Sequence, residues 1–287
     1  MGMAIEAGKE QVMTVINTNV SALRAQNNSR VANQMQSQAM ERLSSGKRIN
    51  AAKDDAAGLA IATRMEANAR GLTQAIRNAN DGISLAQTAD TAAGSISDIL
   101  VRMRELALQA STGTNGTTDR AAVQTEVAAL ISQIGDVASR TTFNGNTLIN
   151  GGVSTTAGFD IQTGLNATEV VNIRIANLNA TGLGVNALDF STAAGATGAL
   201  ATLDTAIQTV ATERANLGAQ QNRLTSAVDN LTSSVTNMSE SKSRIEDADF
   251  SVESTNLEAA GILAQASTAM LAQANQSSQG VVDLLRG

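Results

Sequence analysis

The sequence predicts a mostly α-helical protein, an elongated antiparallel helical bundle or coiled coil with a small β-hairpin element. Three observations support this prediction. The 287 residues include no Pro, which would interrupt long helices. Aromatic residues make up only 1% of the chain and hydrophobic residues 43%, so any core consists of small aliphatic side chains on closely approaching backbones. Long stretches also repeat apolar residues every three or four positions, the period of one helix face.

The clearest repeat lies between residues 200 and 238. Its stripe runs through Leu200, Leu203, Ile207, Val210, Arg214, Leu217, Gln221, Leu224, Val228, Leu231, Val235 and Met238. All but Arg214 and Gln221 are apolar. A stripe of this length predicts a coiled-coil helix, on the order of 58 Å long at about 1.5 Å per residue.

Two earlier stripes, Leu72 to Ala86 and Ile96 to Ala110, are out of phase with each other. The phase change indicates either a bend or a change of packing partner. The run GTNGTT at 113–118 ends this pattern, and Thr118 or Asp119 can cap a further helix over 123–137. We expect an antiparallel helical hairpin that packs on the 200–238 rod.

Residues 141–199 are rich in Asn, Gly, Thr and Ser and form the predicted β-rich segment. Asn144-Gly145 and Asn150-Gly151 are typical turn pairs. The runs GFDIQTG and VVNIRIANL alternate apolar and polar residues, so they predict the two strands of a hairpin.

The two ends of the chain have opposite formal charge, positive over 13–50 and negative over 238–287, so they should attract each other. Both carry broken apolar seams in Ala-rich and Ser-rich surroundings. We expect these helices to be largely unfolded alone and to gain order by packing between subunits. The predicted packing residues are Val20, Leu23, Val31, Met35, Leu43, Leu257, Leu263, Met270, Leu271, Leu284 and Leu285.

Composition argues against catalysis and against several partners. The chain has no His or Cys, which removes the usual general base, thiol nucleophile and transition-metal ligands. We expect no enzyme activity and no cofactor. A net charge of −6 gives no general attraction to nucleic acid, and no segment is apolar enough for a membrane span. We expect no cleaved signal peptide in residues 1–20.

Three local motifs have simpler interpretations than a site. The adjacent carboxylates Asp54 and Asp55 diverge on a helix, so a solvated or inter-subunit ion-pair network is favoured over a metal site. Gly182, Gly184 and Ala187 fit a loose dinucleotide pattern that is expected to be a loop. Thr255 and Glu258 have the spacing of a capping box at a helix start, or match it by chance.

Nine segments resemble bacterial flagellin and follow the same order along the chain. They are VINTNVSAL (15–23), ERLSSGKRINAAKDDAAGLAIA (41–62), RNANDGISLAQTAD (77–90), VRMRELALQA (101–110), FNGNTLING (143–151), GAQQNRLTSAVDNL (218–231), SRIEDADF (243–250), LAQANQ (271–276) and LLR (284–286). The resemblance implies a structural subunit that polymerises into the extracellular filament of the bacterial flagellum for swimming motility. It implies an inner coiled-coil domain from 13–50 with 250–287, and an outer domain from 51–249. Residues 1–12 precede the usual family start.

The resemblance also implies partners. They are further copies of the chain, an export chaperone at about 240–287, and the filament cap and hook-junction proteins. It implies export without a cleaved signal peptide. The set Arg102, Arg104, Glu105, Leu106 and Glu126 resembles the contact site for the animal flagellin-sensing Toll-like receptor, although Val101 stands where Gln is frequent. The alternative function is another secreted coiled-coil component, such as a hook-junction or needle-type protein.

Overall fold

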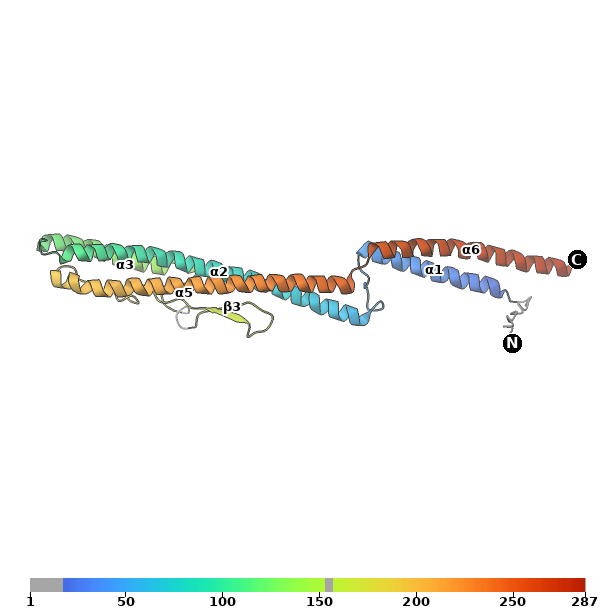
Figure 1. Cartoon of the computed structure of the whole chain (residues 1–287), viewed down its shortest axis with the longest axis horizontal. Coiled ribbons are helices and arrows are strands. Elements are labelled where there is room, and N and C mark those ends of the chain that lie inside the picture. Colours follow the sequence, from blue (N-terminus) through green and yellow to red (C-terminus); the bar gives the residue numbers. More distant parts are fainter. Residues whose placement is uncertain (1–17, 153–156, 287) are drawn as a thin grey trace, which may run out of the picture. The chain divides into compact units, whose positions relative to one another are not determined.

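The computed structural model describes residues 18–152 and 157–286, and for 281–286 it describes the backbone alone. The predicted N-terminal extension, residues 1–12, lies outside the described residues. The helices are α1 (Val20–Ser45), α2 (Ala56–Ser111), α3 (Thr117–Arg140), α5 (Ala193–Glu246) and α6 (Phe250–Arg286). The strands are β1 (Thr142–Phe143), β2 (Asn146–Thr147), β3 (Phe159–Gln162) and β4 (Val170–Ile173) (Figure 1). The predicted fold class is confirmed.

The chain divides into two compact units. The central unit comprises residues 65–240. The terminal unit comprises the chain up to residue 64 and from residue 241 onward, of which 18–64 and 241–286 are described. Helices α2 and α5 each contribute residues to both units. Among the described residues, none of the helices combines the length and apolar character that crossing a membrane requires.

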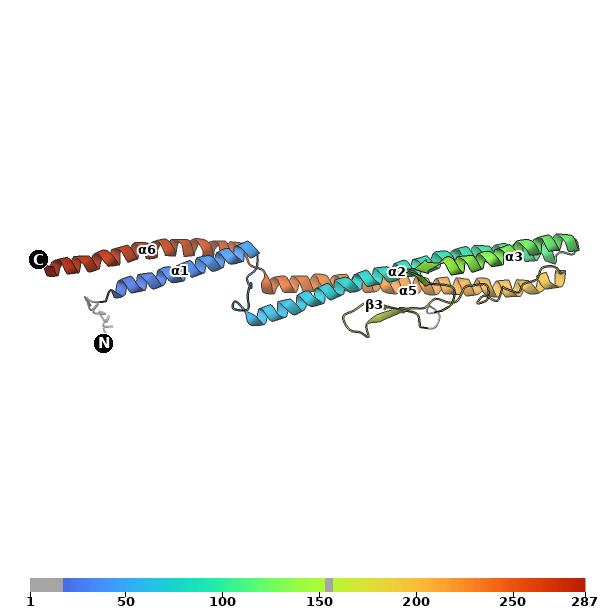
Figure 2. The ribbon, with the colours of Figure 1, turned by 180° about the vertical axis from the view of Figure 1, so that it is seen from behind.

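The central unit is built from α2, α3 and α5, which run along one another (Figure 2). Buried residues recur every seven positions along α5, at Leu203, Val210, Leu217, Leu224 and Leu231. This spacing is the heptad of a coiled coil, so the predicted rod at 200–238 is confirmed. One of the two polar members of the stripe, Arg214, pairs with Asp90 of α2 at 2.8 Å.

Helix α5 begins at Ala193, so the predicted β-rich segment 141–199 extends too far at its C-terminal end. The side chain of Thr192 accepts a hydrogen bond from Gly195 N at 3.0 Å and caps the first turn. Ala196 and Ala199 are buried in the core. The alanines of this stretch favour a helix although its glycines are typical of loops.

The phase change within α2 reflects a change of partner, because α2 is a single helix from Ala56 to Ser111. Near its start in the central unit, Leu72 and Ala75 pack in one small cluster with Leu231 of α5. From Ala79 onward the helix belongs to a larger core that also includes α3. Where a helix packs against two neighbours instead of one, its apolar residues shift to a different position around the helix axis.

The predicted helical hairpin is confirmed and its ends are tied by side chains. Arg120 of α3 donates to the carbonyl oxygens of Ala110 at 2.8 Å and Thr112 at 3.0 Å, at the end of α2. The Asp119 carboxylate accepts a hydrogen bond from Gly116 N at 3.0 Å, just before α3 begins. Asp119 therefore stabilises the helix start from inside the first turn.

Two antiparallel hairpins lie between α3 and α5. Asn144 and Gly145 have φ of 48° and 80° and form the turn between β1 and β2, as the Asn-Gly pair predicts. The predicted strands within 159–173 are confirmed as β3 and β4, which pair Phe159 with Ile173. Residues 182–187 form turns without a dinucleotide-binding helix, as expected.

Candidate assembly interface

The described part of the terminal unit is dominated by the antiparallel pair of α1 and α6, drawn in blue and red in Figure 1. At one end of the pair, Asn19 Nδ2 donates to the carbonyl oxygen of Ala274 at 3.0 Å, and the Asn19 side chain also caps α1 by accepting from Ala22 N. At the other end, Arg42 Nη1 pairs with Glu253 Oε1 at 2.9 Å. These long-range contacts fix the register of the two helices.

Small side chains form most of the seam between α1 and α6. In α1 the buried residues are Ala25, Ala32 and Ala39, each seven residues from the next. In α6 the same spacing gives Glu253, Ala260 and Ser267, all buried. Leu43, Leu257 and Leu271 are half-buried beside them. Alanine and serine let two backbones approach closely, but they remove little apolar surface from water.

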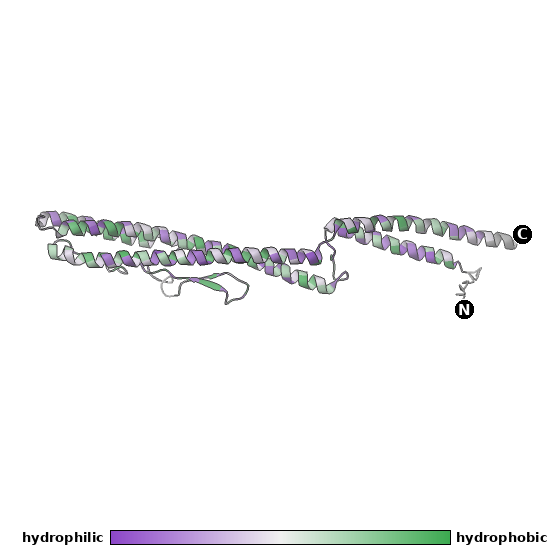
Figure 3. Ribbon diagram, viewed as in Figure 1, coloured by the Kyte–Doolittle hydropathy of each residue, from purple (hydrophilic) through white to green (hydrophobic). Residues whose placement is uncertain are grey.

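Most of the large apolar side chains described in this pair are exposed instead. Leu23 is 56% exposed, Ile262 64% and Phe250 73%. The full set is Val20, Leu23, Val31, Met35, Met40, Phe250, Val252, Ile262, Leu263 and Met270. Figure 3 shows hydrophobic residues recurring along α6. A concentration of exposed large apolar residues marks a surface that packs against another protein.

Five of these residues form one surface, which we call the apolar face. Successive residues of an α-helix turn by about 100°, so Val31 and Met35 lie about 60–100° from the seam of α1. Val252, Leu263 and Met270 lie about 60–80° from the seam of α6, in the same rotational sense. When two antiparallel helices face each other, the same sense of rotation on each leads to the same side of the pair. The two stripes therefore adjoin.

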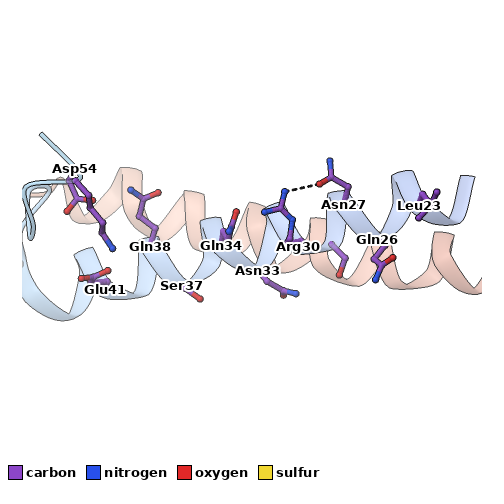
Figure 4. A pocket seen from close by; sticks show the side chains of 12 residues that line it. Leu23, Gln26, Asn27, Arg30, Asn33, Gln34, Ser37, Gln38, Glu41 and Asp54 are labelled. Atoms are coloured by element: carbon purple, nitrogen blue, oxygen red, sulfur yellow. Dashed lines mark hydrogen bonds between the residues drawn. The ribbon is translucent and has the colours of Figure 1, made fainter. Parts of the chain in front are cut away.

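A different side of α1 is lined by amides. Gln26, Asn33 and Gln34 line an open groove of about 1050 Å³, together with residues that include Arg30, Lys53 and Asp54 (Figure 4). Arg30 Nη2 donates to Asn27 Oδ1 at 3.0 Å along this side. Because amides lose hydrogen bonds to water when they are buried, this amide side is poorly suited to dry packing. The apolar face is suited to it.

The start of α6 is clamped to the end of α1. Gly46 ends α1 with φ of 71°, and its carbonyl accepts a hydrogen bond from Ala248 N at 3.0 Å. Arg48 N donates to the carbonyl of Glu246 at 2.7 Å, and Lys47 Nζ pairs with the buried Glu246 carboxylate at 2.5 Å. These contacts therefore hold the exposed residues near the start of α6 in a fixed position relative to the end of α1.

The cap of α6 is Asp249, so the capping-box interpretation of Thr255 and Glu258 is wrong. Asp249 Oδ1 accepts hydrogen bonds from Ser251 N at 2.8 Å and Val252 N at 3.2 Å. The helix begins at Phe250, which places Thr255 and Glu258 inside it. The helix starts at the cap six residues upstream of Thr255, because Asp249 is a good N-cap and no helix breaker lies between the two candidates.

The carboxylates of Asp54 and Asp55 stabilise the chain locally. Asp54 Oδ2 accepts from Ala51 N at 3.0 Å and Asn50 N at 3.1 Å, and the bond from Ala51 lowers the pKa of Asp54 below its usual range, with burial opposing. Asp55 Oδ1 accepts from Gly58 N at 2.8 Å and caps α2. Both carboxylates thus accept hydrogen bonds from backbone N–H groups, and the solvated or inter-subunit ion-pair network stays a prediction.

The residues that resemble a receptor contact divide into two groups. Arg102 donates to Glu126 at 2.8 Å and to Glu105 at 3.1 Å, which brings these three exposed side chains together. Its hydrogen bond to Glu126 raises the pKa of Arg102. Arg104 instead pairs with Asp204 of α5 at 2.6 Å, which raises the pKa of Arg104. Leu106 is buried in the core of the central unit.

Two sequence profiles match the chain. The bacterial flagellin N-terminal helical region matches residues 16–154, and the bacterial flagellin C-terminal helical region matches residues 200–285. A flagellin of Xenorhabdus nematophila is 42% identical over 316 aligned residues, which cover 95% of this chain and 99% of that protein. The chain belongs to the bacterial flagellin family. Flagellins of Halalkalibacterium halodurans and Bacillus subtilis are 42% and 40% identical, and cover 95% and 94% of this flagellin and 100% and 99% of their own lengths.

This flagellin is a structural protein. It polymerises into the extracellular filament of the bacterial flagellum and thereby supports swimming motility. The alternative, a hook-junction or needle-type component, is not favoured.

The structure sorts the predicted packing residues into different environments. Val20, Leu23, Val31, Met35, Leu263 and Met270 are exposed. Leu43, Leu257 and Leu271 are half-buried beside the seam. The side chains of Leu284 and Leu285 lie outside the described residues. Met40, Phe250 and Val252 are also exposed and were not among the predicted residues. Counted from Leu263 on α6, Met270 lies seven positions ahead and Val252 eleven positions back, and both spacings return to the same stripe of the helix.

Proposed function

We propose that the pair of α1 and α6 is the assembly element of this flagellin, and that its apolar face packs against neighbouring copies in the filament. One observation carries the proposal. The pair keeps Ala and Ser in its seam while Leu263, Met270 and Val31 remain in water. Fully burying one such side chain stabilises by about 1.5–3 kcal/mol, so assembly gains what the isolated pair does not.

In this proposal, residues 13–50 with 250–287 form the inner layer of the filament and residues 51–249 the outer layer. The terminal helices become ordered as they are incorporated, because the isolated pair buries little apolar area against the entropy of ordering. A heterologous contact that does not close into a ring then propagates as a helical polymer.

The proposal is tested with two serine variants of the apolar face, Val31→Ser and Leu263→Ser, and with Gln34→Ser on the amide side as the matched control. Purified subunits are added to filament seeds and the polymer is collected by sedimentation. We expect both apolar-face variants to leave most protein in the supernatant and Gln34→Ser to sediment like the parent. Normal sedimentation of both apolar-face variants would show that another surface drives assembly.

The partners implied by the family belong to the same proposal. Residues 240–287 bind an export chaperone, the assembled unit contacts the filament cap and hook-junction proteins, and the chain is exported without a cleaved signal peptide. The exposed apolar stripe of α6 supports the first of these, because a surface that packs between copies has to be covered before assembly. Co-purification of the chaperone with the full chain and its loss on Leu263→Ser would support this role. Mass spectrometry of the secreted protein tests the absence of cleavage.

A second candidate role is recognition by the animal flagellin-sensing Toll-like receptor. The cluster of Arg102, Glu105 and Glu126 supports it, because the three charged groups are exposed and held together. Val101 and Leu108 on the same helix are 45% and 47% exposed, which adds apolar contact area nearby. Loss of receptor binding by monomeric Glu126→Ala, with wild-type sedimentation into filaments, would support this role.

A further inference from the structure

The six methionines within the described residues divide by unit. Met35, Met40 and Met270 of α1 and α6 are 44%, 57% and 63% exposed. In the central unit, Met103 is fully buried, and Met65 and Met238 are half-buried. The exposed thioethers therefore belong to the pair to which the assembly role is assigned, and Met35 and Met270 lie in the apolar face itself.

An exposed thioether reacts with peroxide. The methionine sulfur attacks one peroxide oxygen, the O–O bond breaks, an S–O bond forms and the other oxygen leaves as water. The sulfur loses two electrons and hydrogen peroxide gains them, so the reaction is balanced without a further reagent. The product sulfoxide is polar, so it no longer suits an apolar contact.

We propose that Met35 and Met270 are oxidation sites that control the incorporation of this flagellin into the filament. Peroxide converts both to sulfoxides in the free subunit, where they are exposed. The oxidised subunit is then rejected at the growing end, because packing would bury an S–O group without a hydrogen-bond partner. In the assembled filament the same packing shields both residues from peroxide.

This inference rests on the proposed role of the apolar face. Its first test is seeded elongation of subunits treated with hydrogen peroxide, with peptide mass spectrometry to locate the added oxygen. We expect oxygen on Met35, Met40 and Met270 and none on Met103, and elongation reduced about tenfold or more. A methionine sulfoxide reductase should restore elongation as it removes the oxygen.

Leucine variants assign the effect to residues, because leucine has similar volume and does not react. We expect Met35→Leu/Met270→Leu to elongate normally before and after peroxide, and Met40→Leu to remain as sensitive as the parent. Unchanged elongation of the oxidised parent overturns the proposal, and so does equal sensitivity of the double leucine variant.

Peroxide treatment of preformed filaments tests the shielding. We expect Met35 and Met270 to gain oxygen at least about tenfold more slowly there than in free subunits, and equal rates would contradict the shielding. The role of the apolar face is judged separately by untreated Val31→Ser and Leu263→Ser. If these assemble normally, the proposed function fails; if they do not and oxidised parent still assembles, only the oxidation inference fails.

Discussion

The buried seam residues of α5 and those of the pair of α1 and α6 recur with the same seven-residue period, but they are large in α5 and mostly small in the pair. In α5 the seam positions hold Leu203, Val210, Leu217 and Leu224, all fully buried. In α1 they hold Ala25, Ala32 and Ala39. A leucine buries about three more carbon groups than an alanine, which corresponds to roughly 2 kcal/mol per seam layer. The period determines that two helices pair, and the size of the seam residues determines whether the pair is stable alone.

Shortening a seam leucine of the rod should give the largest effect. Leu217→Ala in α5 is expected to lower the free energy of unfolding of the central unit by about 2–5 kcal/mol, because a fully buried side chain leaves a cavity. Urea denaturation of the monomer measures the change. A loss below about 1 kcal/mol would show that the rod does not depend on its seam in the way that the comparison requires.

Enlarging a seam alanine of the terminal pair should give the next largest effect. Ala32→Leu introduces three carbons where α1 and α6 approach closely, and overpacking of this kind costs about 1–3 kcal/mol. We expect filaments of this variant to dissociate at lower temperature, measured by light scattering. Gln34→Leu adds similar apolar surface to the open amide side of α1 and serves as the control. Equal behaviour of the two variants would argue against a tight alanine seam.

Trimming an exposed leucine should separate stability from assembly. Leu263→Ala is expected to change monomer unfolding by less than about 0.5 kcal/mol, because the side chain is half in water. The same variant should raise the critical concentration for polymerisation about tenfold, equivalent to about 1.4 kcal/mol. Sedimentation at several protein concentrations measures it. The reverse pattern would place Leu263 in the fold of the subunit rather than between subunits.

Most of the fold was predictable because the spacing of apolar residues and the residues that favour turns are local features of the sequence. The stripe at 200–238 predicted the rod, and Asn144-Gly145 predicted its turn. The start of α5 at Ala193 was missed because alternating Gly and Ala give no clear period. The cap of α6 at Asp249 was missed because Thr255 and Glu258 also have the spacing of a capping box.

The candidate site was less predictable than the fold. The hydrophobic residues of α6 look alike in sequence, yet Leu257 and Leu271 are half-buried beside the seam while Leu263 and Met270 are exposed. Which stripe faces α1 depends on alanines, whose contribution to a hydrophobic pattern is weak. The register depends on Arg42 and Glu253, which are 211 positions apart in the chain. Such long-range pairs leave no local signal.

The smallest effect concerns the turn between α1 and α2. The hydrogen bond from Ala51 N, followed by that from Asn50 N, lowers the pKa of Asp54 below the ordinary value of 3.8. A carboxyl whose pKa is lower in the folded state stabilises the fold above its unfolded pKa of about 3.9 and loses that contribution as pH falls through the folded value. The turn should therefore keep its structure at pH 5 to 7 and loosen below about 4.

Nuclear magnetic resonance of the monomer can follow this loss at the amide protons of Asn50 and Ala51. We expect both resonances to titrate with one midpoint below 3.8, and Asp54→Asn to abolish that transition while leaving the central unit unchanged. A midpoint at or above about 4 would mean that the turn is not formed in the free subunit. The disorder expected of the terminal helices before assembly would then extend through residue 55, to the start of α2.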